Sequence, residues 1–140
     1  MRTRAFLDSN VFLFALERPR SNSRRVVQLL SEGVVRGVVT DRIVREVLRY
    51  FRRHYSKDVG GKFRDFLIFS CDLVLEDDLP NRREFVGAVG AKDAGALAAV
   101  RTLEISRLVS TDSDFAGVPE WRTPREFLLG LHERAGPGEE

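Results

Sequence analysis

The sequence predicts an α/β fold in which a mainly parallel sheet carries helices on both faces. Short apolar or β-branched runs, typical of buried strands, alternate along the chain with segments whose apolar residues recur at helical spacing. The chain has 140 residues, and 43% of them are hydrophobic, which suits one packed core rather than two. We therefore expect residues 1–134 to form a single domain.

Five segments have the character of strands. They cover residues 4–7, 34–40, 72–76 and 107–111, together with a short stretch near Trp121. Polar or charged residues follow each of the longer runs, as expected where a strand leaves a sheet and a helix or turn begins.

Helical segments occupy most of the remaining chain. They are expected at residues 11–17, 24–31, 41–56, 62–70, 81–89 and 93–104, with a last helix that starts at Pro124 after the capping residue Thr123. Gly60 and Gly61 are expected to mark a turn. The polar tail, residues 135–140, is expected to be disordered.

Composition excludes several kinds of chemistry. A single cysteine, Cys71, rules out an internal disulfide or a cysteine-cluster zinc site, and two histidines leave little for an imidazole-based centre. Any catalysis must therefore depend on carboxylates. No apolar run approaches the roughly 18 to 20 residues that span a bilayer, and an acidic residue stands at position 8, so we expect a cytoplasmic protein without a membrane segment.

Almost all of the basic residues are arginine. The net charge is only +2, but all but three of the 23 basic residues are arginine. Arginine presents a planar group that suits phosphate, so the bias is consistent with a nucleic-acid substrate. A GC-rich coding sequence or a hot habitat gives the same bias, and this alternative stays open.

Four carboxylates are predicted to gather at one edge of the sheet. Asp8 follows the first strand, Asp112 ends the fourth, Asp93 opens a helix, and Glu46 lies beside the apolar stripe of the helix after the second strand. In parallel sheets, functional sites form outside the carboxyl ends of the strands. Asp114 lies two residues beyond Asp112.

Each of these residues also has a purely structural interpretation. Asp8 is a suitable helix cap, and Glu46 can pair with neighbouring arginines on a solvated face. Asp93 suits the positive end of a helix, and Asp112 and Asp114 are common turn formers. Taken together, however, such carboxylates would repel one another strongly unless a cation neutralised them.

Oxygen ligands without thiol or imidazole select a hard divalent cation, either Mg²⁺ or Mn²⁺. Such an ion lowers the pKa of a bound water and polarises a phosphoryl oxygen. An acidic metal site in an arginine-rich chain therefore predicts a phosphodiester substrate.

Four motifs resemble those of the PIN domains, and most closely those of the small VapC-like ribonuclease toxins. In chain order they are FLDSNVFLFAL, TDRIVREVLRYF, AKDAGALAAV and LVSTDSDF, and WRTPREFL is similar to the closing strand and helix of the family. The resemblance extends from residue 4 to about residue 131. Gly95, early in the third motif, departs from the pattern, and residues 55–78 match no motif.

The resemblance implies a PIN-like three-layer α/β/α sandwich and assigns roles to particular residues. It implies catalytic roles for Asp8, Glu46, Asp93 and Asp112, and metal binding by Asp8, Asp93, Asp112 and Asp114. Asn10 and Ser110 would support this site, and Asp112 is expected to matter more than Asp114.

The resemblance also implies an activity and partners. The chain would be a Mg²⁺- or Mn²⁺-dependent endoribonuclease, the toxin of a toxin–antitoxin pair, acting as a homodimer that a small antitoxin protein inhibits. Arg52 and Arg53 are candidate RNA contacts. A PIN nuclease of RNA processing and a non-catalytic RNA-binding module remain alternatives. An aspartyl phosphotransferase would need an acid two residues after Asp8, where Asn10 stands.

Overall fold

The central element of the fold is a five-stranded parallel sheet in the order β3-β2-β1-β4-β5. The computed structural model describes residues 3–80 and 82–140. The strands are β1 (Thr3–Leu7), β2 (Val35–Thr40), β3 (Cys71–Val74), β4 (Leu108–Val109) and β5 (Trp121–Arg122). Every neighbouring pair is parallel, which confirms the predicted sheet.

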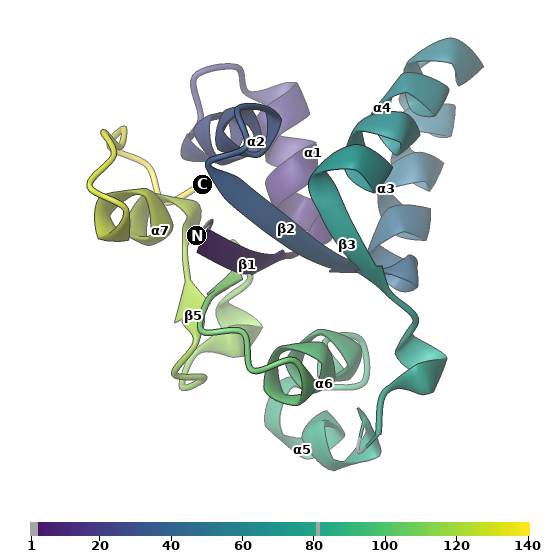
Figure 1. The fold of residues 1–140 in the computed structure, drawn as a ribbon, viewed down its shortest axis with the longest axis vertical. Helices are drawn as coiled ribbons and strands as arrows, with labels where there is room; N and C mark the ends of the chain where they lie inside the picture. The colour runs from purple at the N-terminus through teal and green to yellow at the C-terminus, as the bar shows by residue number, and fades with distance from the viewer. Residues whose placement is uncertain (1–2, 81) are drawn as a thin grey trace.

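Helices cover the sheet in two layers. They are α1 (Ser9–Glu17), α2 (Asn22–Ser31), α3 (Asp41–His54), α4 (Lys57–Ser70), α5 (Val86–Val89), α6 (Ala94–Thr102) and α7 (Pro124–Gly130). Figure 1 shows α1 to α4 on one side of the sheet and α5 and α6 on the other. This arrangement confirms the predicted three-layer α/β/α sandwich.

The register of the central strands brings distant residues to one edge of the sheet. Leu7, the last residue of β1, is aligned with Val109, the last residue of β4. The backbone N–H of Asp8 donates to the carbonyl of Val109 at 3.0 Å. The residues that follow these two strands therefore leave the sheet side by side, although about a hundred residues separate them.

A close backbone approach explains the glycine inside β2. A Cβ atom at Gly37 would lie 2.6 Å from the sulfur of Cys71 on β3, and 3.2 Å from a methyl group of Leu7 on β1. Buried Cys71 therefore fills the space that a side chain at position 37 would need. The thiol acts as a small apolar group in the core, and burial raises its pKa to about 12.

The glycine pair at positions 60 and 61 does not form the expected turn but lies within α4. This helix begins earlier than predicted because Ser56 caps it, with the Ser56 hydroxyl accepting from the N–H of Val59 at 3.3 Å. Gly60 is buried, and an added Cβ would lie 3.7 Å from the Cβ of Phe51 on α3. The turn between α3 and α4 falls instead at Tyr55 and Ser56.

The chain between β3 and α6 is less regular than expected. In place of one helix over residues 81–89, a 3₁₀ helix, η2 (Arg82–Phe85), precedes the short helix α5, and another 3₁₀ helix, η1 (Glu76–Asp78), comes before them. Residue 81 lies outside the described residues. The third strand ends at Val74 rather than at Glu76, so Glu76 belongs to η1.

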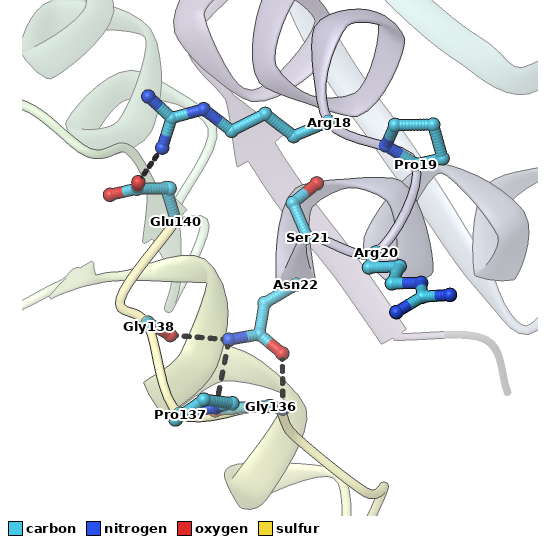
Figure 2. Close-up of a pocket in the computed structure, with 9 residues that line it drawn as sticks. All are labelled: Arg18, Pro19, Arg20, Ser21, Asn22, Gly136, Pro137, Gly138 and Glu140. Carbon is cyan, nitrogen blue, oxygen red and sulfur yellow. Dashed lines mark hydrogen bonds and ion pairs between the residues drawn. The ribbon is translucent and has the colours of Figure 1, made fainter.

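The polar C-terminal tail, for which composition predicts disorder, lies against α2 and α7. The side chain of Asn22 accepts from the N–H of Gly136 at 2.7 Å and donates to the carbonyls of Gly136 and Gly138 (Figure 2). Arg18 forms an ion pair with Glu140. A cavity of about 630 Å³ lies between the tail and the α1–α2 turn, and its lining contains none of the candidate acids.

Within the described ranges, no helix combines the length and the apolar character that crossing a membrane requires.

Candidate metal centre

Asp8 caps helix α1 and lines a small cleft with two other candidate acids, Glu46 and Asp93. It has an extended backbone conformation at the end of β1, and its Oδ1 accepts from the N–H of Ser9 at 2.8 Å, which caps α1. Its Oδ2 accepts from the hydroxyl of Ser110 at 2.8 Å and from the amide of Asn10 at 3.3 Å. The side chain is thus fixed by three donors.

Ser110 and Asn10 connect the first and fourth strands at this edge. The Asn10 amide donates to the Ser110 hydroxyl at 3.1 Å, and Asn10 Oδ1 accepts from the N–H of Thr111 at 3.1 Å. The Ser110 hydroxyl also accepts from the N–H of Asp112 at 3.0 Å. One hydroxyl thereby orients both Asp8 and the start of the loop that carries Asp112 and Asp114.

Three carboxylates converge beside this network. Among the described residues, Asp93, Asp112 and Asp114 each place an oxygen within 4.8 Å of the other two. Asp93 is 4% exposed, Asp112 is half-buried and Asp114 is exposed. Asp112 Oδ1 accepts from the N–H of Asp114 at 2.9 Å, so the turn that presents these two acids is fixed by one of them.

The electrostatic state of the cluster reflects burial and repulsion. Burial, then the charges of Asp8 and Asp112, raise the pKa of Asp93 from 3.8 to about 6, while nearby Lys92 opposes the shift. Burial also raises the pKa of Asp8, against the lowering effect of its hydrogen bond from Ser110. The site is therefore short of positive charge.

Glu46 approaches the same region from α3. Its Oε2 accepts from the Ser9 hydroxyl at 2.9 Å, and its Oε1 accepts from Arg42 Nε at 3.2 Å. The pairing with an arginine one turn away agrees with the structural interpretation. The bond from Ser9 nevertheless places Glu46 beside Asp8, and both line a small cleft with Asp93.

The two predicted RNA contacts lie away from this cleft. Arg52 and Arg53 are exposed in the last turn of α3. Arg52 lines a separate cavity of about 450 Å³ together with Lys57 and Arg64. Arg42 instead lines both the acidic cleft and an adjoining cavity of about 460 Å³, so it lies closer to the candidate metal centre.

Three charged residues that line the cleft were not predicted as site residues from the sequence: Arg42, Lys92 and Glu76. Lys92 precedes Asp93 and lines the cleft, and Glu76, only 8% exposed, lines it from η1. Glu76 comes shortly after the end of β3. Functional sites form outside the carboxyl ends of parallel strands, and this argument, which selected Asp8, also applied to Glu76. Gly95 was a second signal, because a Cβ there would lie 2.0 Å from Glu76 Oε1.

Comparisons with known proteins agree with this architecture. The model of a PIN domain family matches residues 4–114. A chain of a toxin–antitoxin complex from Klebsiella pneumoniae is similar in structure, with a TM-score of 0.70 and 20% identity over 87% of this chain and 98% of that one. No curated protein matches the chain closely enough in sequence to count as a relative.

A second similar structure is a chain of VapBC2 from Rickettsia felis, solved bound to a DNA fragment from its promoter. The TM-score is 0.61 and the identity is 12%, over 85% of this chain and 96% of that one. At these identities the likeness concerns the fold.

Replacing Asp93 by asparagine is expected to stabilise the metal-free protein near neutral pH. Because the folded state holds the Asp93 proton up to about pH 6 and the unfolded state releases it near 3.8, stability from this group falls as pH rises between those values. Asp93→Asn should flatten that fall, as measured by urea unfolding across the range. Asp65→Asn, at an exposed acid on α4, is the control. An unchanged pH slope in Asp93→Asn would contradict the assigned electrostatics.

Proposed function

The chain is a member of the PIN domain family, and from that premise we propose that it is a metal-dependent endoribonuclease of the VapC-like toxin type. The observation that carries the proposal is the convergence of Asp93, Asp112 and Asp114, with oxygens within 4.8 Å of one another. Asp8 and Glu46 adjoin this group, so all the acids that the family resemblance selects lie at one edge of the sheet.

The donor set fits a divalent cation. All the converging groups are carboxylates, the ligand type preferred by Mg²⁺ and Mn²⁺. Burial, and after it the charges of Asp8 and Asp112, raise the pKa of Asp93, and a cation bound here would favour the ionised carboxylate. We propose that Asp93, Asp112 and Asp114 hold the ion with a contribution from Asp8. When bound, such an ion polarises a phosphoryl oxygen and favours ionisation of a water molecule.

The side chains around the ion would orient water and substrate. Glu46 is proposed to accept a proton from the attacking water, whose oxygen forms a bond to phosphorus while the bond to the leaving ribose oxygen breaks. The leaving oxygen takes its proton from solvent. Asn10 and Ser110 are proposed to keep Asp8 in place through their hydrogen bonds. Arg42, which lines the acidic cleft, is proposed to bind a phosphate of the substrate, and Arg52 and Arg53, which do not line it, are proposed as further RNA contacts.

The proposed biological partner is a small antitoxin protein, and the proposed location is the cytoplasm. The two similar structures come from a toxin–antitoxin complex of Klebsiella pneumoniae and from VapBC2 of Rickettsia felis. This likeness supports the toxin reading over the two alternatives, a nuclease of RNA processing and a non-catalytic RNA-binding module.

We also propose that the chain forms a homodimer through the β3 edge of the sheet. β3 is an edge strand, and exposed apolar side chains gather at it and at the adjoining end of α4: Ile68, Phe69, Leu73 and Leu75. Phe69 is 81% exposed. Exposed apolar surface at a sheet edge favours association, and a second copy supplies the same apolar surface in return.

RNA cleavage should require a divalent cation and the acidic cluster. Demetallated protein is expected to be inactive on a single-stranded RNA, with activity restored by Mn²⁺ or Mg²⁺. Asp93→Asn should lower the cleavage rate by about 100-fold or more, because it removes a charge from the metal centre. The control is Asp65→Asn, which should cleave like the wild type. Full cleavage by carefully demetallated protein would contradict the proposal, and binding of RNA without any cleavage would favour the non-catalytic alternative.

The dimer is tested by sedimentation equilibrium. The wild type is expected to be dimeric at tens of micromolar, and Phe69→Glu to be monomeric because it places a charge in the apolar contact. Leu129→Glu, on α7 at a similarly exposed apolar position, should leave the dimer intact. A monomeric wild type would refute the dimer, and a dimeric Phe69→Glu would place the contact elsewhere.

A further inference from the structure

Glu76 is a buried carboxylate that has no role in the proposed reaction. It is 8% exposed and lines the acidic cleft together with Asp8, Glu46 and Asp93. Adding another negative charge to a group of acids costs free energy, unless that charge has compensating contacts of its own. The contacts of the Glu76 carboxylate therefore indicate its role in the structure.

Two hydrogen bonds fix Glu76 to the end of β2 and the start of α3. The Thr40 hydroxyl donates to Glu76 Oε2 at 2.9 Å, and the N–H of Glu76 donates to Asp41 Oδ1 at 3.0 Å. Thr40 is the last residue of β2 and also caps α3, since its hydroxyl accepts from the N–H of Ile43 at 3.3 Å. Glu76 is thus anchored where a central strand meets the helix that carries Glu46.

The other carboxylate oxygen lies against the first turn of α6. A Cβ atom at Gly95 would lie 2.0 Å from Glu76 Oε1, so the carboxylate occupies the space of a side chain. The N-terminal turn of a helix carries partial positive charge, which favours a carboxylate at this place. Glycine inside a helix lowers its stability, and contact with Glu76 explains why glycine stands there.

The first turn of α6 determines where Asp93 lies, because Asp93 is the residue immediately before the helix. In the described residues between β3 and α6, the helices are short: η1, η2 and α5. The buried surface of α6 consists largely of alanine side chains, which interlock less than large ones do. A contact with a larger side chain at this turn therefore helps to fix its rotation and position.

We propose that Glu76 is a positioning residue, whose carboxylate holds the first turn of α6, and with it Asp93, against the carboxyl end of β2. The inference rests on the proposed function, because it takes Asp93 as a metal ligand. Both oxygens of Glu76 have neighbours in the protein: Oε2 accepts from the Thr40 hydroxyl, while Oε1 lies 4.0 Å from Arg82 Nη1 and fills the space beside Gly95. These contacts favour positioning over direct metal binding.

The first test measures Mn²⁺ binding to metal-free protein by calorimetry. Glu76→Ala is expected to weaken binding by about 10- to 100-fold, the usual effect of losing a group that orients a metal ligand. Glu76→Gln, which has the same shape and keeps an acceptor for Thr40, should restore most of the affinity. Asp77→Ala, which removes the adjacent acid with a 93% exposed side chain, is the control and should bind like the wild type.

The Asp93→Asn background shows whether Glu76 acts through Asp93. There, Glu76→Ala should have no further effect on the residual Mn²⁺ affinity. An undiminished effect in that background, wild-type affinity in Glu76→Ala, or equal losses in Glu76→Ala and Glu76→Gln would each overturn the proposal. The last result would mean that the charge of Glu76 matters rather than its contacts. A wild type that binds no Mn²⁺ would instead refute the proposed function.

A second test does not depend on metal. Gly95→Ala should lower the thermal unfolding temperature of the otherwise wild-type protein, because its Cβ collides with the carboxylate. In the Glu76→Ala background the same substitution should raise the unfolding temperature, because alanine is the better helix former once the space is free. A change of the same sign and size in both backgrounds would show that the contact between Glu76 and the α6 turn is absent.

Discussion

Negative charge concentrated at the carboxyl ends of the parallel strands is the constraint on which the rest of this structure depends. Because the strands are parallel, the residues that follow them lie at the same end of the sheet, here Asp8 after β1 and Asp112 beyond β4. Asp93 arrives there at the start of α6, on the opposite face from α1 to α4 (Figure 1). Burial, and after it the charges of Asp8 and Asp112, raise the pKa of Asp93 to about 6, so the ionised form of this carboxylate is disfavoured in the folded protein.

Hydrogen bonds and an ion pair to the acids lower the free-energy cost of bringing these carboxylates together, but they do not remove it. Asp8 receives hydrogen bonds from the N–H of Ser9, the Ser110 hydroxyl and the Asn10 amide. Glu46 receives one from Ser9 and an ion pair from Arg42. Asp8 can therefore cap α1 through Oδ1 while Ser110 and Asn10 hold its Oδ2 beside the other acids. The remaining negative charge at Asp93 is what a divalent cation would neutralise.

The sequence predicts those parts of the site that depend on local structure. The strand that ends at Leu7 and the turn after Val109 follow from short patterns, so the positions of Asp8 and Asp112 at the sheet edge could be expected. Their roles in catalysis stay predictions. Glu76 was missed because its burial depends on α6 returning across an irregular segment, which no local pattern describes. Gly95 departed from the family pattern, and its reason lies in that same distant contact.

The glycine pair in α4 and the C-terminal tail also differ from what composition indicates, and in both places the structure shows contacts that the local sequence does not describe. Gly60 and Gly61 have low helix propensity, but the Ser56 cap and the packing of Gly60 near Phe51 include them in α4. The C-terminal tail has the composition of a disordered segment. In the structure this segment forms hydrogen bonds with Asn22, which lies far from it in the sequence (Figure 2).

The most direct test of the central claim is a crystal structure determined after soaking with Mn²⁺, with anomalous scattering used to locate the ion. We expect an anomalous peak bounded by the carboxylates of Asp93, Asp112 and Asp114, next to Asp8, and its loss in crystals of Asp93→Asn. No peak between these carboxylates at saturating Mn²⁺, or a peak only at acids elsewhere on the chain, would contradict the account.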